Sequence, residues 1–338
     1  MTTPDRGVPR CAPRGGLARL GAARRRARAA QGGAALLMAM VIVTLIVSLA
    51  ASMIWQQWRA VQVETAERAR SQAAWILTGA LDWARLILRE DARNAGPDHL
   101  GEPWAVPLAE ARLSTFLAAD RENAEGAPDA FLSGSISDAQ ALYNLRNLVD
   151  GNGKIVPDEL RALERLCTAV GVSLTTATNI ANVMQSALAA AASPENEVAP
   201  LLPGSVMQFS WAGVSTDELR RLQPYVALLP RATPVNLNTA SREVLVAAID
   251  GLDLSSAERL VQARQRNPFN GIPDAQALVP QGVTLNAQRV DIRSNFFEVR
   301  GRLRLGERAL EERSLVERRR LDIVVIDRER LGLAETAR

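Results

Sequence analysis

The chain has 338 residues, 47% of them hydrophobic, so it is long enough for about two folded domains and disorder along its whole length is excluded. Its net charge is +3, but the segment before Gly33 carries eight arginines against one aspartate. Taking that +7 away leaves about −4 for the rest, which has no overall electrostatic attraction for nucleic acid. One histidine and two cysteines make a multi-histidine metal site, a four-cysteine zinc site or a disulfide framework hard or impossible to build.

An uncharged apolar segment follows this basic head. As a helix rising about 1.5 Å per residue, residues 34–54 span roughly 31 Å, the thickness of the hydrocarbon core of a bilayer. Trp55 and Trp58 follow it, where aromatic side chains anchor a helix at the membrane interface. Arginines are denser before the segment than behind it, so the positive-inside rule predicts a cytoplasmic N-terminus and a large C-terminal part outside.

The small residues of this segment stand in an unusual place. In an ordinary secretory signal they follow the apolar core, whereas here Gly32-Gly33 precedes it. This order resembles the class III leader of type IV pilins and pseudopilins. The resemblance implies that residues 1–33 are a leader, which a prepilin peptidase removes after Gly33 before it methylates Ala34.

Met38 is the fifth residue of the expected mature chain. The resemblance implies a glutamate at this position, which pairs with the terminal amine of the adjacent subunit in the low dielectric of the membrane. An uncharged side chain cannot make that contact. Among pseudopilins, a chain without this glutamate resembles the type II secretion protein K family. The members of that family are large minor pseudopilins that are proposed to sit at the filament tip.

The apolar segment continues into an amphipathic stretch, and no proline interrupts residues 14–96. The apolar stripe consists of Leu77, Leu81, Ala84 and Leu88. We expect one helix over about residues 34–89 that packs on a globular domain through this stripe. The alternative is a membrane helix and a separate soluble helix, with a break near Trp58. We expect Trp75 and Trp83, eight residues apart, to be core residues.

The hydrophobic pattern changes several times after this helix. It predicts a helical piece over 108–119, a strand pair over 131–149 around Asp138, helices over 157–192, a proline-rich linker over 193–203 and a helix-rich module over 216–278. Residues 297–303 then alternate between apolar residues or glycine and arginine, which predicts a strand, and residues 321–326 predict another.

A motif with the sequence Asn-Leu-Asn-Thr-Ala occupies residues 236–240. Thr239 or Ser241 can cap the helix that follows, Gly251 ends it, and Ser255 or Ser256 starts the next. This arrangement resembles the helix-hairpin-helix motif.

The turn of this hairpin departs from the DNA-binding form. That form has two glycines, so that backbone N–H groups can approach a phosphate. Here Asp253 replaces the second glycine and Asp250 precedes the turn. Because two carboxylates repel a phosphate, we expect a structural hairpin, with DNA contact as the alternative. The same signature resembles the helical modules, similar to sterile alpha motifs, of the type II secretion protein K family.

Two further segments resemble that family. Residues 138–149 are similar to its D-x-x-G-x-F-N-L-N-x-L segment, and residues 294–301 to its S-x-Y-F-x-V-x-G strand. The resemblance implies an α+β fold, in which a pilin-like long N-terminal helix packs on a small antiparallel sheet with a large helical insertion.

We divide the chain accordingly. After the leader we expect the N-terminal helix over 34–92, the first part of the pilin-like domain over 93–149, two helical modules over 150–232 and 233–282, C-terminal strands over 283–328 and a tail over 329–338.

Asp150, Asp158 and Glu159 lie in a polar turn that looks like part of a calcium loop. An EF-hand is excluded, because Ile155 and Arg161 occupy the positions of its glycine and glutamate. The alternatives are a plain polar turn and a different calcium site, since the resemblance implies that family members can bind calcium nearby. We expect no other cofactor, and we find no phosphate loop, nucleophile elbow or catalytic pair.

We therefore expect a non-enzymatic minor pseudopilin that caps or initiates the periplasmic pseudopilus of the type II secretion system. Its expected partners are other minor pseudopilins in a heteromeric tip complex, prepilin peptidase and the inner membrane, but no nucleic acid. It should cross the inner membrane once, with its C-terminal domain in the periplasm. The alternatives are a membrane-anchored helix-hairpin-helix DNA-binding protein and a membrane-bound enzyme.

Overall fold

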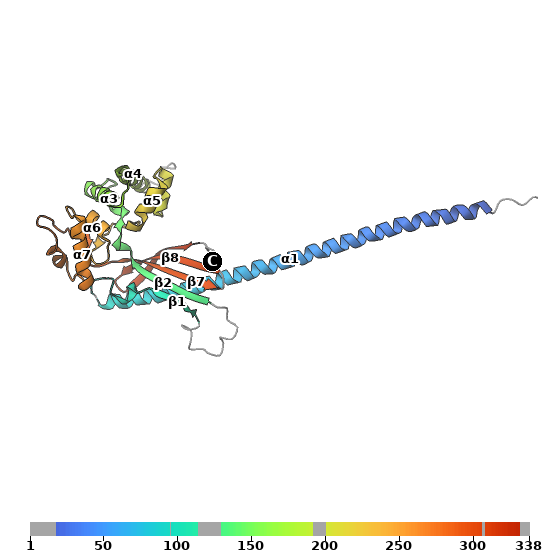
Figure 1. Cartoon of the computed structure of the whole chain (residues 1–338), viewed down its shortest axis with the longest axis horizontal. Helices are drawn as coiled ribbons and strands as arrows, with labels where there is room; N and C mark the ends of the chain where they lie inside the picture. Colours follow the sequence, from blue (N-terminus) through green and yellow to red (C-terminus); the bar gives the residue numbers. More distant parts are fainter. Residues whose placement is uncertain (1–17, 95, 114–129, 192–200, 306–307, 332–338) are drawn as a thin grey trace, which may run out of the picture. The chain divides into compact units, whose positions relative to one another are not determined.

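The computed structural model describes residues 18–94, 96–113, 130–191, 201–305 and 308–331 (Figure 1). The chain divides into two compact units, residues 1–71 and 72–338. Helix α1 (Ala18–Asn94) is a single helix without interruption, so the prediction of one helix is confirmed and the alternative of a break near Trp58 is wrong.

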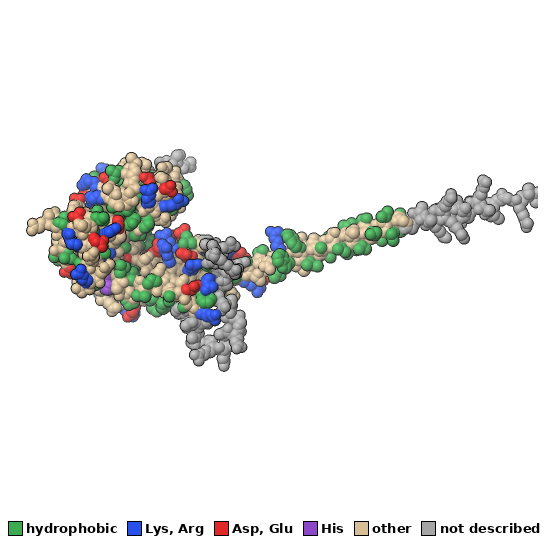
Figure 2. All heavy atoms as spheres, viewed as in Figure 1, with side chains coloured by type: hydrophobic (Ala, Val, Ile, Leu, Met, Phe, Trp, Pro, Cys, Tyr) green, Lys and Arg blue, Asp and Glu red, His purple; other side chains and the backbone are tan. Residues whose placement is uncertain are grey.

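The first unit consists of the N-terminal part of α1. The mean hydropathy of its most apolar 18 residues is 2.7, and none of these residues is buried. Figure 2 shows hydrophobic side chains along this part of the helix, which has no charged side chain between residues 33 and 58. By length and composition, this helix can cross a membrane.

The second unit contains a five-stranded antiparallel sheet with the order β1-β2-β7-β8-β9. Its strands are β1 (Leu108–Arg112), β2 (Ala130–Asp138), β7 (Phe296–Leu305), β8 (Arg308–Arg319) and β9 (Asp322–Leu331). The last part of α1 lies beside this sheet (Figure 1). All four residues of the predicted stripe are buried there, and the long helix on a small antiparallel sheet confirms the expected α+β class.

Strand β7 has the predicted alternation. Phe297, Val299 and Leu303 are buried in the clusters that contain the α1 stripe. Gly301 lies between them, opposite Gly134 of β2. A Cβ atom on Gly301 would lie 3.1 Å from Leu77 Cδ2, so the missing side chain makes room for α1 on the sheet.

Two predictions near the sheet are wrong. Residues 108–112 form strand β1 and not a helix, because pairing with β2 decides the conformation of this short segment; residues 114–119 lie outside the described residues. Residues 131–149 do not form a strand pair. The Asp138 carboxylate accepts a hydrogen bond from Gln140 N and turns the chain after β2 into a short 3-10 helix, and the partner of β2 is the distant β7.

Trp75 and Trp83 are not core residues. Their exposed fractions are 77% and 50%. Each lies two residues from a member of the buried stripe, Leu77 or Leu81, which at about 100° per residue puts it on the opposite side of the helix. The exposed face of α1 therefore carries two large aromatic side chains.

The segment between β2 and β7 carries further helices, as predicted. They are α3 (Pro157–Val170), α4 (Leu174–Ala191), α5 (Thr216–Leu222), α6 (Arg242–Ala248), α7 (Leu254–Arg266) and α8 (Ile272–Gln276). Short 3-10 helices accompany them: η1 (Pro103–Ala105) before β1, then η3 (Ala139–Ala141), η4 (Leu145–Leu148), η5 (Val206–Ala212) and η6 (Gln223–Tyr225). Two short parallel pairs complete the segment, β3 (Tyr143–Asn144) with β4 (Val226–Ala227) and β5 (Val235–Asn236) with β6 (Val290–Asp291).

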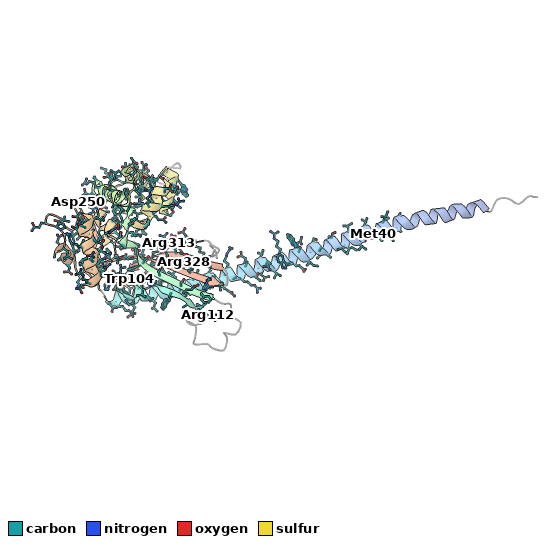
Figure 3. The ribbon with its side chains drawn as sticks, in the orientation of Figure 1. Met40, Trp104, Arg112, Asp250, Arg313 and Arg328 are labelled. Carbon is teal, nitrogen blue, oxygen red and sulfur yellow. The ribbon has the colours of Figure 1, made fainter. Side chains whose placement is uncertain are left out.

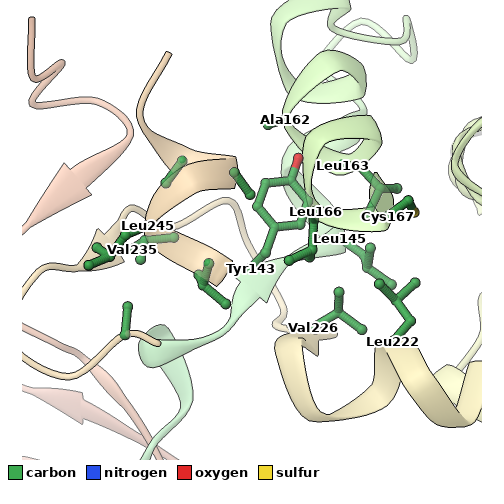
Figure 4. Close-up of a cluster of buried hydrophobic side chains, with 14 of the residues drawn as sticks. Tyr143, Leu145, Ala162, Leu163, Leu166, Cys167, Leu222, Val226, Val235 and Leu245 are labelled. Carbon is green, nitrogen blue, oxygen red and sulfur yellow. The ribbon is translucent and has the colours of Figure 1, made fainter. Parts of the chain in front are cut away.

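These helices share one hydrophobic core. Figure 4 shows side chains from β3, η4, α3, α5 and α6 meeting in it, among them Tyr143, Leu163, Leu222 and Leu245. The predicted helical region over 157–192 is two helices, because Gly171 ends α3 with a left-handed φ of 71°. Residues 193–200 of the predicted linker lie outside the described residues.

The predicted hairpin consists of α6 and α7. Ser241 caps α6 by accepting a hydrogen bond from Val244 N, and Gly251 has a left-handed φ of 74° in the turn. The N-cap of α7 is Asp253, which accepts from Ser256 N at 2.7 Å, and not Ser255 or Ser256 as predicted. A carboxylate also complements the positive end of the helix dipole.

Candidate functional site

Gly33, Ala34 and Met38 lie in the exposed N-terminal part of α1. Nothing lies within 4 Å of the position of a Cβ atom on Gly33, and the Met38 side chain is exposed. Cleavage after Gly33, methylation of Ala34 and the role of the uncharged Met38 stay predictions.

The three segments that resemble the protein K family, residues 138–149, 236–240 and 294–301, meet at one buried carboxylate. This carboxylate belongs to Asp138, at the end of β2. Its Oδ1 accepts a hydrogen bond from Gln140 N at 2.7 Å. Its Oδ2 accepts from Asn236 Nδ2 at 3.0 Å, from Thr239 Oγ1 at 2.6 Å and from Ser294 Oγ at 2.6 Å. Burial raises the pKa of Asp138, and the hydrogen bonds from Ser294 and Thr239 oppose this.

This network continues to the end of α1 through Arg318 of β8. Arg318 Nη2 donates to Asp98 Oδ1 at 2.6 Å, and Arg318 Nη1 donates to Asp91 Oδ2 at 2.8 Å. Asp98 Oδ2 also accepts from Ser294 N at 2.7 Å. We call this group the buried polar junction; it consists of Asp91, Asp98, Asp138, Ser294 and Arg318. The buried polar junction connects the sheet, the end of α1 and the inserted helices.

Sequence reasoning missed three members of the buried polar junction, namely Asp91, Asp98 and Arg318. Asp98 directly follows the proline that ends the helical pattern, and Arg318 is the first of three consecutive arginines. The sequence around each of these residues does not distinguish it from a charged residue that is exposed to solvent. Only the pairing of β7 with β8, which brings Arg318 close to residues 294 and 295, reveals their roles.

The Asn-Leu-Asn-Thr-Ala motif makes internal contacts. Asn238 Nδ2 donates to the Phe269 carbonyl at 3.0 Å, and Asn238 Oδ1 accepts from Phe269 N at 2.9 Å. Arg264 Nη1 donates to the Leu237 carbonyl at 2.6 Å, and burial lowers the pKa of Arg264 to about 10. The motif therefore fixes the chain before α6 against α7 and the segment after it.

The turn between α6 and α7 keeps its negative charge. Hydrogen bonds from Ser255 and Ser256 lower the pKa of Asp253. Asp250, labelled in Figure 3, lies 3.0 Å from Arg165 Nη1. A phosphate at this turn would therefore meet a cap carboxylate and a paired aspartate, which disfavours DNA contact.

The polar turn after residue 149 is held by its own backbone. Asp150 Oδ1 accepts from Asn152 N at 2.9 Å and from Lys154 N at 2.8 Å. Glu159 accepts from the Tyr143 hydroxyl at 2.8 Å and lies 3.0 Å from Arg289 Nε, so its carboxylate is engaged outside the turn. Calcium binding near this turn stays a prediction.

Among the described residues, one group of three carboxylates, Asp91, Asp98 and Glu102, has oxygen atoms within 4.8 Å of one another. Arg318 supplies a cation to two of them. Glu102 Oε2 accepts from Trp104 Nε1 at 2.8 Å and from His99 N at 2.9 Å. This group is therefore bonded into the protein through the buried polar junction.

Two family models match the chain, both described as type II secretion system protein K. They match residues 141–231 and 235–293, which lie between β2 and β7. The chain is 27% identical over 290 residues to the type II secretion system protein K of Pseudomonas aeruginosa, covering 79% of this chain and 82% of the relative. It is 28% identical over 317 residues to that of Pectobacterium carotovorum subsp. carotovorum, covering 85% and 92%.

The fold is shared with a solved structure, that of the GspK-GspI-GspJ complex from the enterotoxigenic Escherichia coli type 2 secretion system. The TM-score is 0.60 at 18% identity, and the match covers 79% of this chain and 98% of that one. These findings agree with the pseudopilin interpretation and not with the DNA-binding alternative. Over most of its length the chain is therefore similar to the type II secretion system protein K family.

Proposed function

We propose that this minor pseudopilin joins other minor pseudopilins in a heteromeric complex at the tip of the periplasmic pseudopilus, which it caps or initiates. Its similarity to type II secretion system protein K supports this, and the matched solved structure is a GspK-GspI-GspJ complex. Prepilin peptidase removes the leader after Gly33. The helix then anchors the chain in the inner membrane, with the second unit in the periplasm.

The observation that carries this proposal is an apolar face on the second half of α1. Trp75, Gly79, Trp83 and Leu86 lie within about 80° of one another around the helix axis. Nothing lies within 4 Å of the position of a Cβ atom on Gly79. Glycine in a helix costs roughly 1 kcal/mol relative to alanine, and among the described residues no close neighbour requires a glycine at this position. The open space at Gly79 would let a second helix approach α1 closely.

A groove adjoins this face. It has a volume of about 270 Å³ and lies between α1, the segment around η1, and strands β2 and β7. Trp83 borders it on one side and Val106, also exposed, on the other. Exposed apolar surface of this kind marks a protein-protein contact. We infer that the helix of a partner pseudopilin crosses α1 here.

The size of the inserted segment supports a position at the tip. Residues 139–295 lie between two strands that pair with each other, so they enlarge the head of the subunit without extending its sheet. A subunit within the filament needs room for neighbours above and below it. Met38 also offers no acid to the amine of an adjacent subunit. We infer that no subunit lies above this one.

We assign no catalytic role. The carboxylates of the second unit whose pKa is raised, Asp91, Asp98 and Asp138, are bonded into the buried polar junction, where they hold elements together. Cys167 is buried, and burial raises the pKa of its thiol to about 12, which removes its nucleophilic form. These features support a structural subunit.

Co-purification of the full-length chain with co-expressed minor pseudopilins in detergent tests the proposal. Trp75→Ala and Gly79→Leu should weaken the complex by about tenfold or more, because tryptophans in apolar contacts dominate interface energies. Trp211→Ala is the matched control, since Trp211 is 79% exposed and lies on η5 instead. Equal retention of partners by all three variants would contradict the assignment of this face.

A further inference from the structure

Three carboxylates gather at the end of α1, of which Asp98 is buried and Asp91 and Glu102 are partly buried. Asp91, Asp98 and Glu102 approach one another within 4.8 Å, and the cation bonded to them is Arg318. The exposed fractions of the side chains are 11% for Asp91 and Arg318 and 2% for Asp98. Like charges so close together repel one another in partly buried surroundings.

The three carboxylates do not have equal partners. Arg318 reaches both Asp91 and Asp98, and Asp98 also accepts from Ser294 N. Glu102 accepts from neutral donors, Trp104 Nε1 and His99 N. Oxygen atoms of Asp91 and Glu102 lie within 4.8 Å of each other, so the two carboxylates repel each other when both are ionised.

Charged groups around this cluster come from three neighbouring segments. Asp98 and Glu102 lie in the segment that follows α1, and Arg318 lies on β8. Arg293 lies in the segment before β7, which contacts Asp98 through Ile292 O and Ser294 N. His99 is the nearest other titratable group in the segment that follows α1, and its ring Nδ1 accepts from Gly101 N at 3.1 Å. The carboxyl pair therefore sits at the meeting point of α1, residues 96–105 and β8.

We propose that a proton held between Asp91 and Glu102 closes a clamp that fixes residues 96–105 to the end of α1, and that loss of this proton loosens the segment. With the proton present, one carboxyl donates to the other. When the proton leaves to water, two like charges face each other and Arg318 neutralises only one charge of the group. The segment also carries Asp98, so its order is linked to the buried polar junction.

The titration of Asp91 supports this clamp. Burial, followed by repulsion from and hydrogen bonding with Glu102, raises the pKa of Asp91 from 3.8 to about 6, while Arg318 opposes the rise. The folded chain thus binds the proton more tightly than the unfolded chain does. The stabilisation is complete below pH 3.8 and is lost as the pH rises through about 6.

Hydrogen-deuterium exchange of the full-length chain in detergent tests the clamp, after correction for the intrinsic effect of pH on exchange. Protection of residues 96–105 should fall about tenfold between about pH 5 and about pH 7.5. Asp91→Asn should remove this dependence, because its amide donates to Glu102 at every pH. Glu102→Gln should do the same, which keeps the test open if one variant does not fold.

Two controls separate the clamp from other effects. Asp82→Asn changes an exposed aspartate on the same helix, which pairs with Arg85, and should behave like the parent chain. His99→Gln should keep the pH dependence. Protection that is independent of pH, a dependence that persists in Asp91→Asn and Glu102→Gln, or one that disappears in His99→Gln would overturn the proposal.

Discussion

Removal of the Asp138 carboxylate should destabilise the second unit strongly. In Asp138→Ala, Gln140 N, Thr239 Oγ1 and Ser294 Oγ lose the acceptor that each has in the structure. Asn236 Nδ2 keeps Ser294 Oγ at 3.0 Å as a partner. Each buried donor left without an acceptor costs about 1–3 kcal/mol. The variant also no longer buries a carboxylate, which offsets part of the loss. We expect a net loss of about 3 kcal/mol.

Thermal unfolding of the full-length chain in detergent, followed by near-UV circular dichroism, measures this loss. A change of about 3 kcal/mol corresponds to about 6–12 °C in Tm for a unit of this size. Asp82→Ala, at an exposed position of α1, is the matched control and should change Tm by about 2 °C or less. If Asp138→Ala unfolds within about 2 °C of this control, Asp138 does not join the sheet to the inserted helices as we argue.

A double-mutant cycle isolates one contact of this junction. Thr239→Val keeps the shape of the side chain and removes the hydroxyl that donates to Asp138. If the two residues act together, the double variant Asp138→Ala/Thr239→Val should lose about 1 kcal/mol less than the sum of the single variants. Additive losses would contradict the coupling.

Four further predictions concern processing, packing and binding. Gly33→Leu should leave the precursor uncut, whereas the parent chain should begin with N-methylated Ala34 by mass spectrometry; a mature terminus near residue 55 would contradict the pseudopilin interpretation. Met38→Glu should leave this cleavage intact, as the same measurement shows. Gly134→Ala should lower the unfolding free energy by about 2 kcal/mol, because its Cβ would lie 2.8 Å from the Arg300 carbonyl oxygen, and an unchanged Tm would contradict this. In a gel shift the chain should not bind duplex DNA at physiological salt; salt-sensitive binding that mutation of the turn between α6 and α7 abolishes would favour the DNA-binding alternative.

Elements with local periodicity could be predicted from the sequence. The stripe of α1, the helices α3 and α4 and the alternation of β7 each repeat along a single segment, so no knowledge of partners is needed. The same reasoning should have excluded Trp75 and Trp83 from the core. Two residues along a helix correspond to about 200°, which places both opposite the buried stripe.

Elements that depend on distant partners could not be predicted in this way. Strand β1 has only five residues, and its conformation depends on pairing with β2. The partner of β2 is β7, which lies beyond the whole inserted segment. The local pattern predicted a strand pair within residues 131–149 instead, and this prediction is wrong. The domain boundaries, the processing site and calcium binding stay predictions.

The buried polar junction explains why the family-like segments are spread along the chain. β2 must leave the sheet at residue 138 and β7 must return beside it, since Asp138 pairs with Phe297. The inserted helices therefore begin and end at one place, where backbone polar groups of both strands are buried together. Asp138 supplies acceptors there, and Asn236, Thr239 and Ser294 supply donors from three points along the insertion and its end. Each segment contributes only one or two side chains to this junction. Each is therefore weak as a motif by itself, whereas the ordered set is specific. The residues of these segments therefore join the helical insertion to the sheet. The surface that contacts partner subunits lies elsewhere, and we propose the exposed face of α1.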